Sequence, residues 1–149
     1  MPEKFDLTYV NERNEKVRPV VIHRAIFGSI DRFFGILLEH FAGAFPLWLA
    51  PVQVQVIPIS QVHLDYCLKI QKELKQVGIR VKIDDRNEKL GYKIREAQMQ
   101  KIPYMAVIGD NEVKGETINV RKYGEQQSKS ELIEDFKSNV IQQIKERSL

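Results

Sequence analysis

Residues 79–109 read IRVKIDDRNEKLGYKIREAQMQKIPYMAVIG, and this stretch decides the fold. Over residues 79–83 apolar residues alternate with charged ones, which predicts a strand with one buried face. A helix is expected over about residues 89–101, and Pro103 ends it. Residues 104–108 are continuously apolar, as in a central strand buried on both faces. The stretch therefore predicts a strand, a helix and a second strand in succession.

The same alternation of strands and helices continues on both sides of this stretch. Residues 52–56 read VQVQV, which predicts a half-buried strand, and residues 61–77 predict a helix with one apolar face. A turn is expected at residues 109–111, followed by a strand at Thr117–Lys122. Residues 128–131 read SKSE, the pattern of a capping box, which predicts the start of a C-terminal helix. The expected fold class is α/β, a mixed β-sheet flanked by helices.

The first third of the chain has a different pattern. Residues 5–10 alternate and residues 17–27 follow a polar turn, which predicts a β-hairpin. Ser29 is expected to cap a helix over residues 30–41 that is apolar around most of its circumference and so requires burial on nearly all sides. One hairpin cannot supply that cover. The predicted division is a fragment of a larger domain at 1–45, a connector at 46–51 and a complete domain at 52–149.

The composition is that of a globular protein. The 149 residues are 43% hydrophobic and 29% charged, with a formal net charge of +3, which permits a polyanionic partner without requiring one. Cys67 is the only cysteine, so an internal disulfide and a cysteine-rich zinc cage are both excluded. The first residues lack a signal-peptide pattern, and no apolar stretch is long enough to span a bilayer. We therefore expect a soluble, cytoplasmic protein.

Three stretches carry a family resemblance. Residues 18–33, RPVVIHRAIFGSIDRF, resemble motif 3 of class II aminoacyl-tRNA synthetases in its threonine-specific form. Residues 43–54, GAFPLWLAPVQV, resemble the join between the catalytic and anticodon-binding domains of the same enzymes. Residues 86–96, RNEKLGYKIRE, are similar to the anticodon-binding domain shared by the threonyl, prolyl, histidyl and glycyl enzymes. The resemblance is to the C-terminal part of bacterial threonine–tRNA ligases and covers essentially the whole chain.

The resemblance implies two residues of a catalytic domain. Arg32 corresponds to the motif 3 arginine, which stacks on bound ATP and neutralises it, as suits a planar guanidinium. His23 corresponds to a zinc ligand that helps the family to recognise threonine. The family's other two ligands, a Cys and a His, lie upstream of Met1, and a zinc site needs three or four ligands. Neither ATP nor zinc is therefore expected to bind to this chain alone. The alternative interpretation is that Arg32 is an ordinary arginine at the start of a helix and His23 an ordinary histidine in a strand.

The resemblance also implies a set of RNA-contacting residues. The matching positions are Asn87, Lys89, Arg95, Lys101, Glu112 and Arg121. Arg121 can donate two hydrogen bonds to a guanine edge, and Glu112 can accept from a base N–H. Lys101 stands where relatives often carry arginine, so a phosphate contact suits it better than a bidentate base contact. Two alternatives stay open, a solvated mixed-charge face and a surface ion pair between Glu112 and Arg121.

The implied function is RNA binding by part of a ligase. The full-length enzyme attaches threonine to its tRNA with ATP and is expected to be a homodimer. Because this chain lacks motifs 1 and 2, it is expected to bind the anticodon loop of threonine tRNA but not to aminoacylate. Two alternatives are a stand-alone, non-catalytic RNA-binding or accessory protein built on the same module and a small-molecule-binding α/β domain. The last of these predicts no affinity for tRNA.

Overall fold

The computed structural model describes residues 1–148 and divides the chain into two units. The first unit is Met1–Ile36 and the second comprises the residues from Leu37 onward. The division falls inside helix α1 (Ile30–His40), so it does not mark the edge of a folding domain. The domain boundary expected after residue 45 stays a prediction. Within residues 1–148 no helix has both the length and the apolar character needed to cross a membrane.

The first unit contains a short β-hairpin. Strands β1 (Tyr9–Val10) and β2 (Lys16–Val17) pair antiparallel, with Tyr9 opposite Val17. The Asn11 side chain closes the turn by accepting hydrogen bonds from main-chain N–H groups of the turn itself. The predicted hairpin is confirmed, but its strands were expected at residues 5–10 and 17–27, and both are much shorter than that. A strand needs a ladder partner, and within the described chain residues 18–27 have none.

Helix α1 begins and ends as predicted but buries nothing. The main-chain N–H of Arg32 lies 3.4 Å from Ser29 Oγ, the N-cap arrangement expected from the sequence. Gly43, at a φ of +76°, follows the helix, and its N–H donates to the Leu38 carbonyl over 3.0 Å. No residue of α1 is buried, and Ile30 is 76% exposed. Phe33, which stacks on Phe27 at 4.6 Å, and Leu37 are only partly buried, so most of the apolar surface of this helix is exposed within the described chain.

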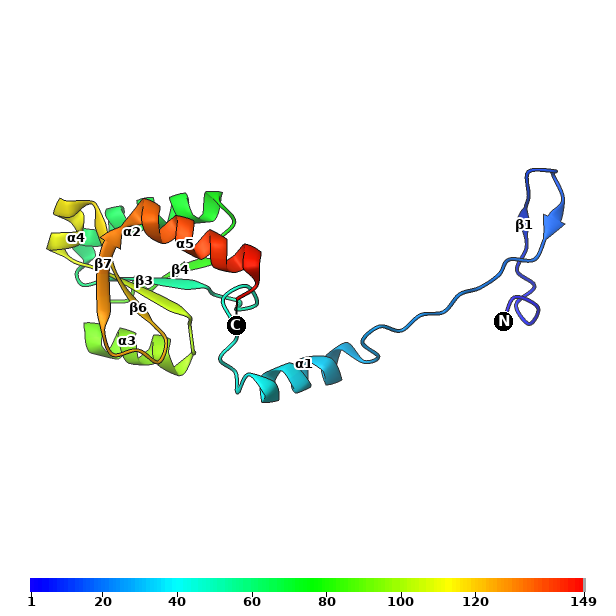
Figure 1. Ribbon diagram of the computed structural model, residues 1–149, viewed down its shortest axis with the longest axis horizontal. Coiled ribbons are helices and arrows are strands. Elements are labelled where there is room, and N and C mark those ends of the chain that lie inside the picture. The colour runs from blue at the N-terminus through cyan, green and yellow to red at the C-terminus, as the bar shows by residue number, and fades with distance from the viewer. Residues whose placement is uncertain (149) are drawn as a thin grey trace. The chain divides into compact units, whose positions relative to one another are not determined.

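The second unit is built on a five-stranded sheet, which confirms the predicted mixed α/β fold (Figure 1). The strand order is β4-β3-β5-β6-β7. The strands are β3 (Val54–Pro58), β4 (Val81–Ile83), β5 (Tyr104–Ile108), β6 (Thr117–Lys122) and β7 (Ser128–Leu132). Strands β3, β4 and β5 are mutually parallel, whereas β6 and β7 run antiparallel to their neighbours. The sheet therefore changes from parallel to antiparallel pairing between β5 and β6.

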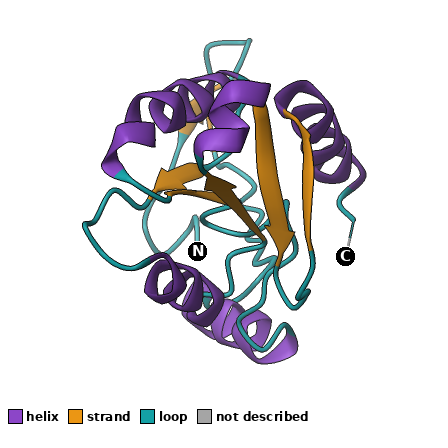
Figure 2. Cartoon of the chain, turned by 90° about the vertical axis from the view of Figure 1, so that its left-hand side faces the viewer, coloured by secondary structure: helices purple, strands orange, loops and turns teal. Residues whose placement is uncertain are grey.

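Helices cover both faces of this sheet. They are η1 (Gln61–His63), α2 (Leu64–Gln76), α3 (Leu90–Met99), α4 (Asp110–Gly115) and α5 (Ile133–Glu146). Helices α2 and α5 lie on one face and α3 on the other (Figure 1), and Figure 2 shows the strands between layers of helix. Gly78 ends the α2 segment at a φ of +83°, the predicted left-handed stop. The expected helices at residues 61–77 and 89–101 are both confirmed.

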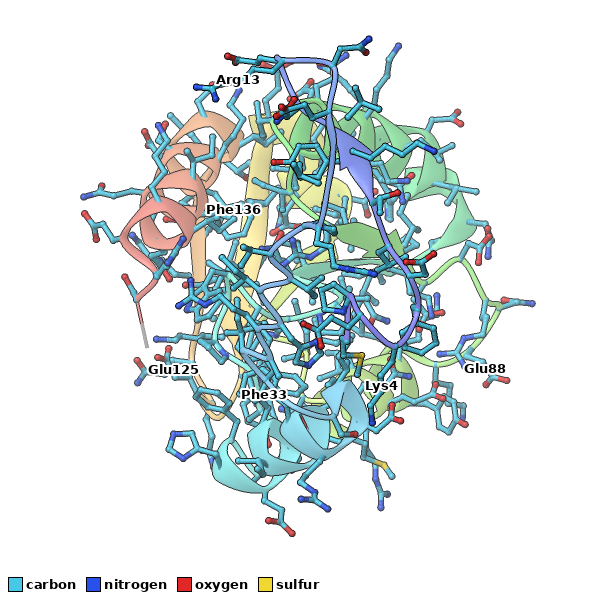
Figure 3. All side chains as sticks on the ribbon, turned by 90° about the vertical axis from the view of Figure 1, so that its right-hand side faces the viewer. Lys4, Arg13, Phe33, Glu88, Glu125 and Phe136 are labelled. Atoms are coloured by element: carbon cyan, nitrogen blue, oxygen red, sulfur yellow. The ribbon has the colours of Figure 1, made fainter. Side chains whose placement is uncertain are left out.

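Two apolar clusters lie on opposite faces of the sheet. The larger one joins α2 and α5 to the sheet and contains Phe136 (labelled in Figure 3). The Phe136 ring meets the Tyr104 ring edge-on, with 5.5 Å between the ring centroids. Cys67 in this cluster is fully buried, and burial raises the pKa of its thiol to about 11, which disfavours the reactive thiolate at neutral pH. The smaller cluster includes Ile57, Ala97 and Met105 and seats α3 on the opposite face. The position of α3 is therefore set by few side chains.

The strand predicted at residues 52–56 is confirmed as β3, but the expectation that it is half-buried is wrong. Every residue of β3 is buried, and so is Gln53 just before it. The Gln53 amide donates to the Leu47 carbonyl over 2.8 Å and accepts from the Arg80 N–H over 2.8 Å. The Gln53 amide is thus hydrogen-bonded at both ends inside the protein, which removes the penalty that burial of an unpaired amide would impose.

Two predictions for the sequence that follows β5 are also wrong. Residues 109–111 are not a simple turn, because the short helix α4 begins at Asp110. Residues 128–131 do not cap a helix but form strand β7, which pairs with β6. Helix α5 begins only at Ile133, and its N-cap residue, Leu132, makes no side-chain cap.

Candidate nucleic-acid interface

On one face of the sheet, β6 carries polar side chains that lie outside the apolar cluster under α3. Along β6, Ile118 and Val120 point into the larger cluster, so Thr117, Asn119 and Arg121 face the opposite side. That is the side on which α3 packs, but the cluster under α3 involves β3 and β5 rather than β6. The polar face of β6 is therefore left half-exposed beside α3.

An open groove lies between α3 and the β6–β7 hairpin, and three of the expected RNA-contacting residues line it. Arg95 contributes from α3, Lys101 from the segment after it, and Arg121 from β6. The other wall is the hairpin turn from Tyr123 to Gln126. Cationic groups from three separate segments therefore converge on one concave surface, which suits a polyanion.

Arg121 and Lys101 are held in different ways. The Arg121 Nε donates to the Glu125 carbonyl over 3.0 Å, which fixes the guanidinium at the groove and leaves its terminal nitrogens for another partner. The Lys101 ammonium donates to the Ala42 carbonyl, and Lys101 itself has a left-handed φ of +55°. In this conformation Arg121 is the better placed of the two to bind a ligand in the groove.

Asn87 and Lys89 lie in the loop between β4 and α3, outside this groove. Both side chains are exposed, and Lys89 is the residue that precedes the first turn of α3. Figure 3 shows Glu88 of this loop and Glu125 of the β6–β7 turn on opposite flanks of the second unit, in keeping with the strand order. Helix α3, about 15 Å long, runs from the loop to the groove. One nucleotide therefore cannot contact both Lys89 and Arg121.

Glu112 is placed on α4, where its carboxylate has a local role. Its Oε2 accepts a hydrogen bond from the Gly109 main-chain N–H over 2.9 Å and so caps α4. It does not line the groove of Arg121. Among residues 1–148 no ion pair joins Glu112 to Arg121, so the surface ion pair considered from the sequence is not formed.

The two residues expected from a catalytic domain are exposed. His23 lies in the segment between β2 and α1, and Arg32 lies in the first turn of α1. Within residues 1–148 no group of three or more His, Cys, Asp and Glu side chains could hold a metal ion. His23 therefore lacks the partners that a zinc site needs.

Several groove residues were not predicted from the sequence. Gln98 and Met99 of α3 and Tyr123 of the hairpin line the groove with the cations. Met99 is 72% exposed, and its position on the helix face opposite buried Ala97 is the pattern that could have identified it. Tyr123 had no comparable pattern, because the β6–β7 hairpin itself was not predicted.

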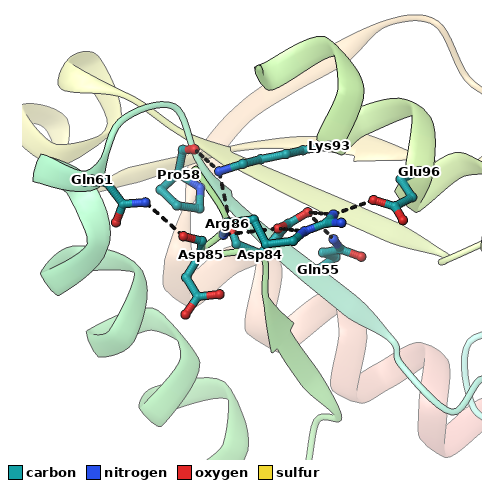
Figure 4. Close-up of polar contacts among 8 residues, drawn as sticks. All are labelled: Gln55, Pro58, Gln61, Asp84, Asp85, Arg86, Lys93 and Glu96. Carbon is teal, nitrogen blue, oxygen red and sulfur yellow. Dashed lines mark hydrogen bonds and ion pairs between the residues drawn. The ribbon is translucent and has the colours of Figure 1, made fainter. Parts of the chain in front are cut away.

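The loop that carries Asn87 and Lys89 is fixed by buried polar groups (Figure 4). Asp84, only 4% exposed, accepts hydrogen bonds from Arg86 Nε over 2.8 Å and from Arg86 Nη2 over 2.6 Å. These bonds hold the pKa of the Asp84 carboxyl below its ordinary value, against the opposing effect of burial.

This arrangement predicts a loss of stability in acid. Because the folded-state pKa of Asp84 is lowered, its contribution is present above its ordinary pKa of about 3.9 and is lost as the pH falls through the lower folded value. Urea unfolding between pH 7 and pH 2.5 is expected to show this decline, and Asp84→Asn is expected to flatten it. An Asp84→Asn profile parallel to that of the unsubstituted chain would contradict the assignment.

Comparisons with known proteins identify the family of this fold. The family model described as "Anticodon binding domain" matches residues 53–146. Threonine–tRNA ligase 2 of Bacillus subtilis is 66% identical over 149 residues, which is 100% of this chain and 23% of that protein. The threonine–tRNA ligase of Syntrophomonas wolfei is 58% identical over the same 149 residues, or 24% of its length. This chain therefore spans about a quarter of the length of these curated relatives.

A solved structure is also similar. It is the RNA-binding domain of threonyl-tRNA synthetase from Cryptosporidium parvum, with a TM-score of 0.73 and 33% sequence identity. The match covers 93% of this chain and 35% of that one. Since the family model matches well over half of its residues, the chain belongs to the anticodon-binding domain family, in a form similar over its whole length to bacterial threonine–tRNA ligases.

Proposed function

We propose that the second unit binds the anticodon loop of a threonine tRNA through the groove beside α3. The observation that carries this proposal is the convergence of Arg95, Lys101 and Arg121 on one open groove next to the uncovered polar face of β6. Unpaired bases of an RNA loop are recognised when they are splayed apart and their edges are hydrogen-bonded. A groove lined by three cations together with the polar side chains of Gln98, Tyr123 and Gln126 meets that requirement.

Because the expected RNA-contacting residues lie at separate places on the second unit, they would contact different nucleotides of the loop. Threonine codons begin with AC, so the anticodons share a G followed by a U. Arg121, with its terminal nitrogens directed to the groove, suits the bidentate contact to guanine O6 and N7. Asn87 and Lys89 lie a helix length away and would contact a different nucleotide and its phosphate. Glu112 would act near the C-terminal ends of the parallel strands, with the carboxylate oxygen that does not cap α4.

Binding to two anticodon stem-loops tests the proposal. One carries GU at the last two anticodon positions and the other carries UG, with the same stem and length. Preferential binding of the GU loop is expected, with a slope of log affinity against log salt of about 0.7 per phosphate contact. Equal affinity for the two loops at every salt concentration would overturn recognition of the anticodon and leave only general attraction of RNA.

We further propose that the chain works as part of a longer threonine–tRNA ligase that uses ATP in the cytoplasm, as a homodimer. The relatives are about four times as long, and α1 has an uncovered apolar surface that a larger catalytic domain would bury. In such a domain Arg32 would contact ATP and His23 would be one of several zinc ligands. Residues 1–148 hold no group of side chains that could complete a zinc site, and we expect no threonine-dependent ATP–pyrophosphate exchange from the chain alone.

A further inference from the structure

The loop from Asp84 to Lys89 is held by more polar contacts than a β–α connection requires (Figure 4). Helix α3 supplies Lys93, which is 3% exposed and donates to the Asp84 carbonyl over 3.2 Å and the Pro58 carbonyl over 3.4 Å. The segment before α2 supplies Gln61, which donates to the Asp85 carbonyl over 2.8 Å. The loop is thus tied to elements on both of its sides.

Arg86 is the centre of this arrangement. Its guanidinium binds the buried Asp84 carboxylate through two nitrogens and binds Glu96 of α3 through one of them. It therefore connects the end of β4 to the middle of α3 across the base of the loop. Asn87 and Lys89 lie between these two anchors with exposed side chains.

Burying Asp84 and Lys93 carries a desolvation cost, which the hydrogen bonds of the loop offset. A loop that is fixed before its ligand arrives loses less conformational entropy on binding, and each mobile side chain that must be immobilised weakens association. A bridge that joins strand, loop and helix provides that order.

Resting on the proposed function, we propose that Arg86 is a positioning residue for RNA binding, which fixes Asn87 and Lys89 in the orientation that the anticodon loop requires. Arg86 acts through Asp84 and Glu96, whose carboxylates occupy its Nε and one terminal nitrogen. It touches no nucleotide itself.

A double-mutant cycle on the full chain tests this role. Arg86→Lys retains the positive charge beside Asp84 but cannot bridge both carboxylates with the same geometry. It is expected to weaken binding of the GU stem-loop by about fivefold to tenfold. In an Asn87→Ala, Lys89→Ala background the same substitution is expected to have less than a twofold further effect, because the groups that it positions are gone.

The matched control is Arg86→Lys in an Arg121→Ala background, where its full effect is expected because Arg121 lies at the other end of α3. An equal effect of Arg86→Lys in all backgrounds, or no effect on binding, would overturn the proposal and indicate a direct contact or a purely structural role.

Glu96→Gln tests the bridge again if Arg86→Lys does not fold, since it leaves the Asp84–Arg86 pair intact. Its effect on binding is expected to depend on Asn87 and Lys89 in the same way. Failure of the unsubstituted chain to prefer the GU loop would instead refute the proposed function.

Discussion

Replacing Arg121 by alanine is expected to reduce the preference of the chain for the GU stem-loop over the UG stem-loop by about tenfold to a hundredfold. Arg121 projects from the uncovered side of β6, and the Glu125 carbonyl holds its guanidinium at the groove. A bidentate arginine–guanine contact discriminates against other bases by about 1–3 kcal/mol. Fluorescence anisotropy titrations of both loops at one fixed salt concentration measure the ratio directly.

Two lysines serve as controls for this result. Lys89→Ala is expected to weaken both loops by a similar factor, because an ammonium group attracts phosphate without distinguishing bases. Lys72→Ala removes an equal charge from α2, on the sheet face opposite the groove, and is expected to change neither affinity by more than about twofold. If Arg121→Ala also weakened binding of both loops equally, Arg121 would contact phosphate, and another residue would recognise the guanine.

The central elements of the sheet could be predicted because their sequence patterns are local. The alternation at residues 79–83 and the apolar run at residues 104–108 each follow from the burial of that segment alone. Strand β7 is different, because Ser128–Leu132 has no apolar alternation and becomes a strand only by pairing with β6, with Glu131 opposite Ile118. Its serines and glutamate satisfy the local rule for a helix start, and tertiary pairing overrides that rule.

In the candidate site, too, the residues could be identified from the sequence, whereas the contacts between them depend on the tertiary fold. The resemblance named Arg95, Lys101 and Arg121, and the fold places them around one groove, but their meeting depends on β6 lying beside β5 and on α3 crossing the same sheet face. The buried bridge of Asp84, Arg86 and Glu96 was not predicted either, because a run of charged residues between two elements is ordinarily solvated. Asp84 is buried only in the folded protein, where Arg86 binds its carboxylate through two nitrogens.

The largest loss of stability is expected from Phe136→Ala. Phe136 is 1% exposed and packs edge-on against Tyr104, so it joins α5 to the central strand β5. Truncating a buried phenylalanine to alanine removes apolar burial and leaves a cavity, at a cost of about 3–5 kcal/mol. Urea unfolding followed by circular dichroism is expected to show a loss of this size. Leu132→Ala, a neighbouring apolar residue that is 53% exposed, is the control and is expected to lie within about 0.5 kcal/mol of the unsubstituted chain.

Substitution of Phe136 also distinguishes an effect on stability from an effect on RNA recognition, because Phe136 packs on the sheet face opposite the groove. In conditions that keep the variant folded, Phe136→Ala is therefore expected to retain the ratio of affinities for the GU and UG loops, whereas Arg121→Ala loses that ratio and keeps its stability. A Phe136→Ala protein that is fully folded but no longer distinguishes the loops would mean that the groove depends on α5. The two sheet faces could then not be treated as independent, and the assignment of RNA recognition to the α3 face alone would be wrong.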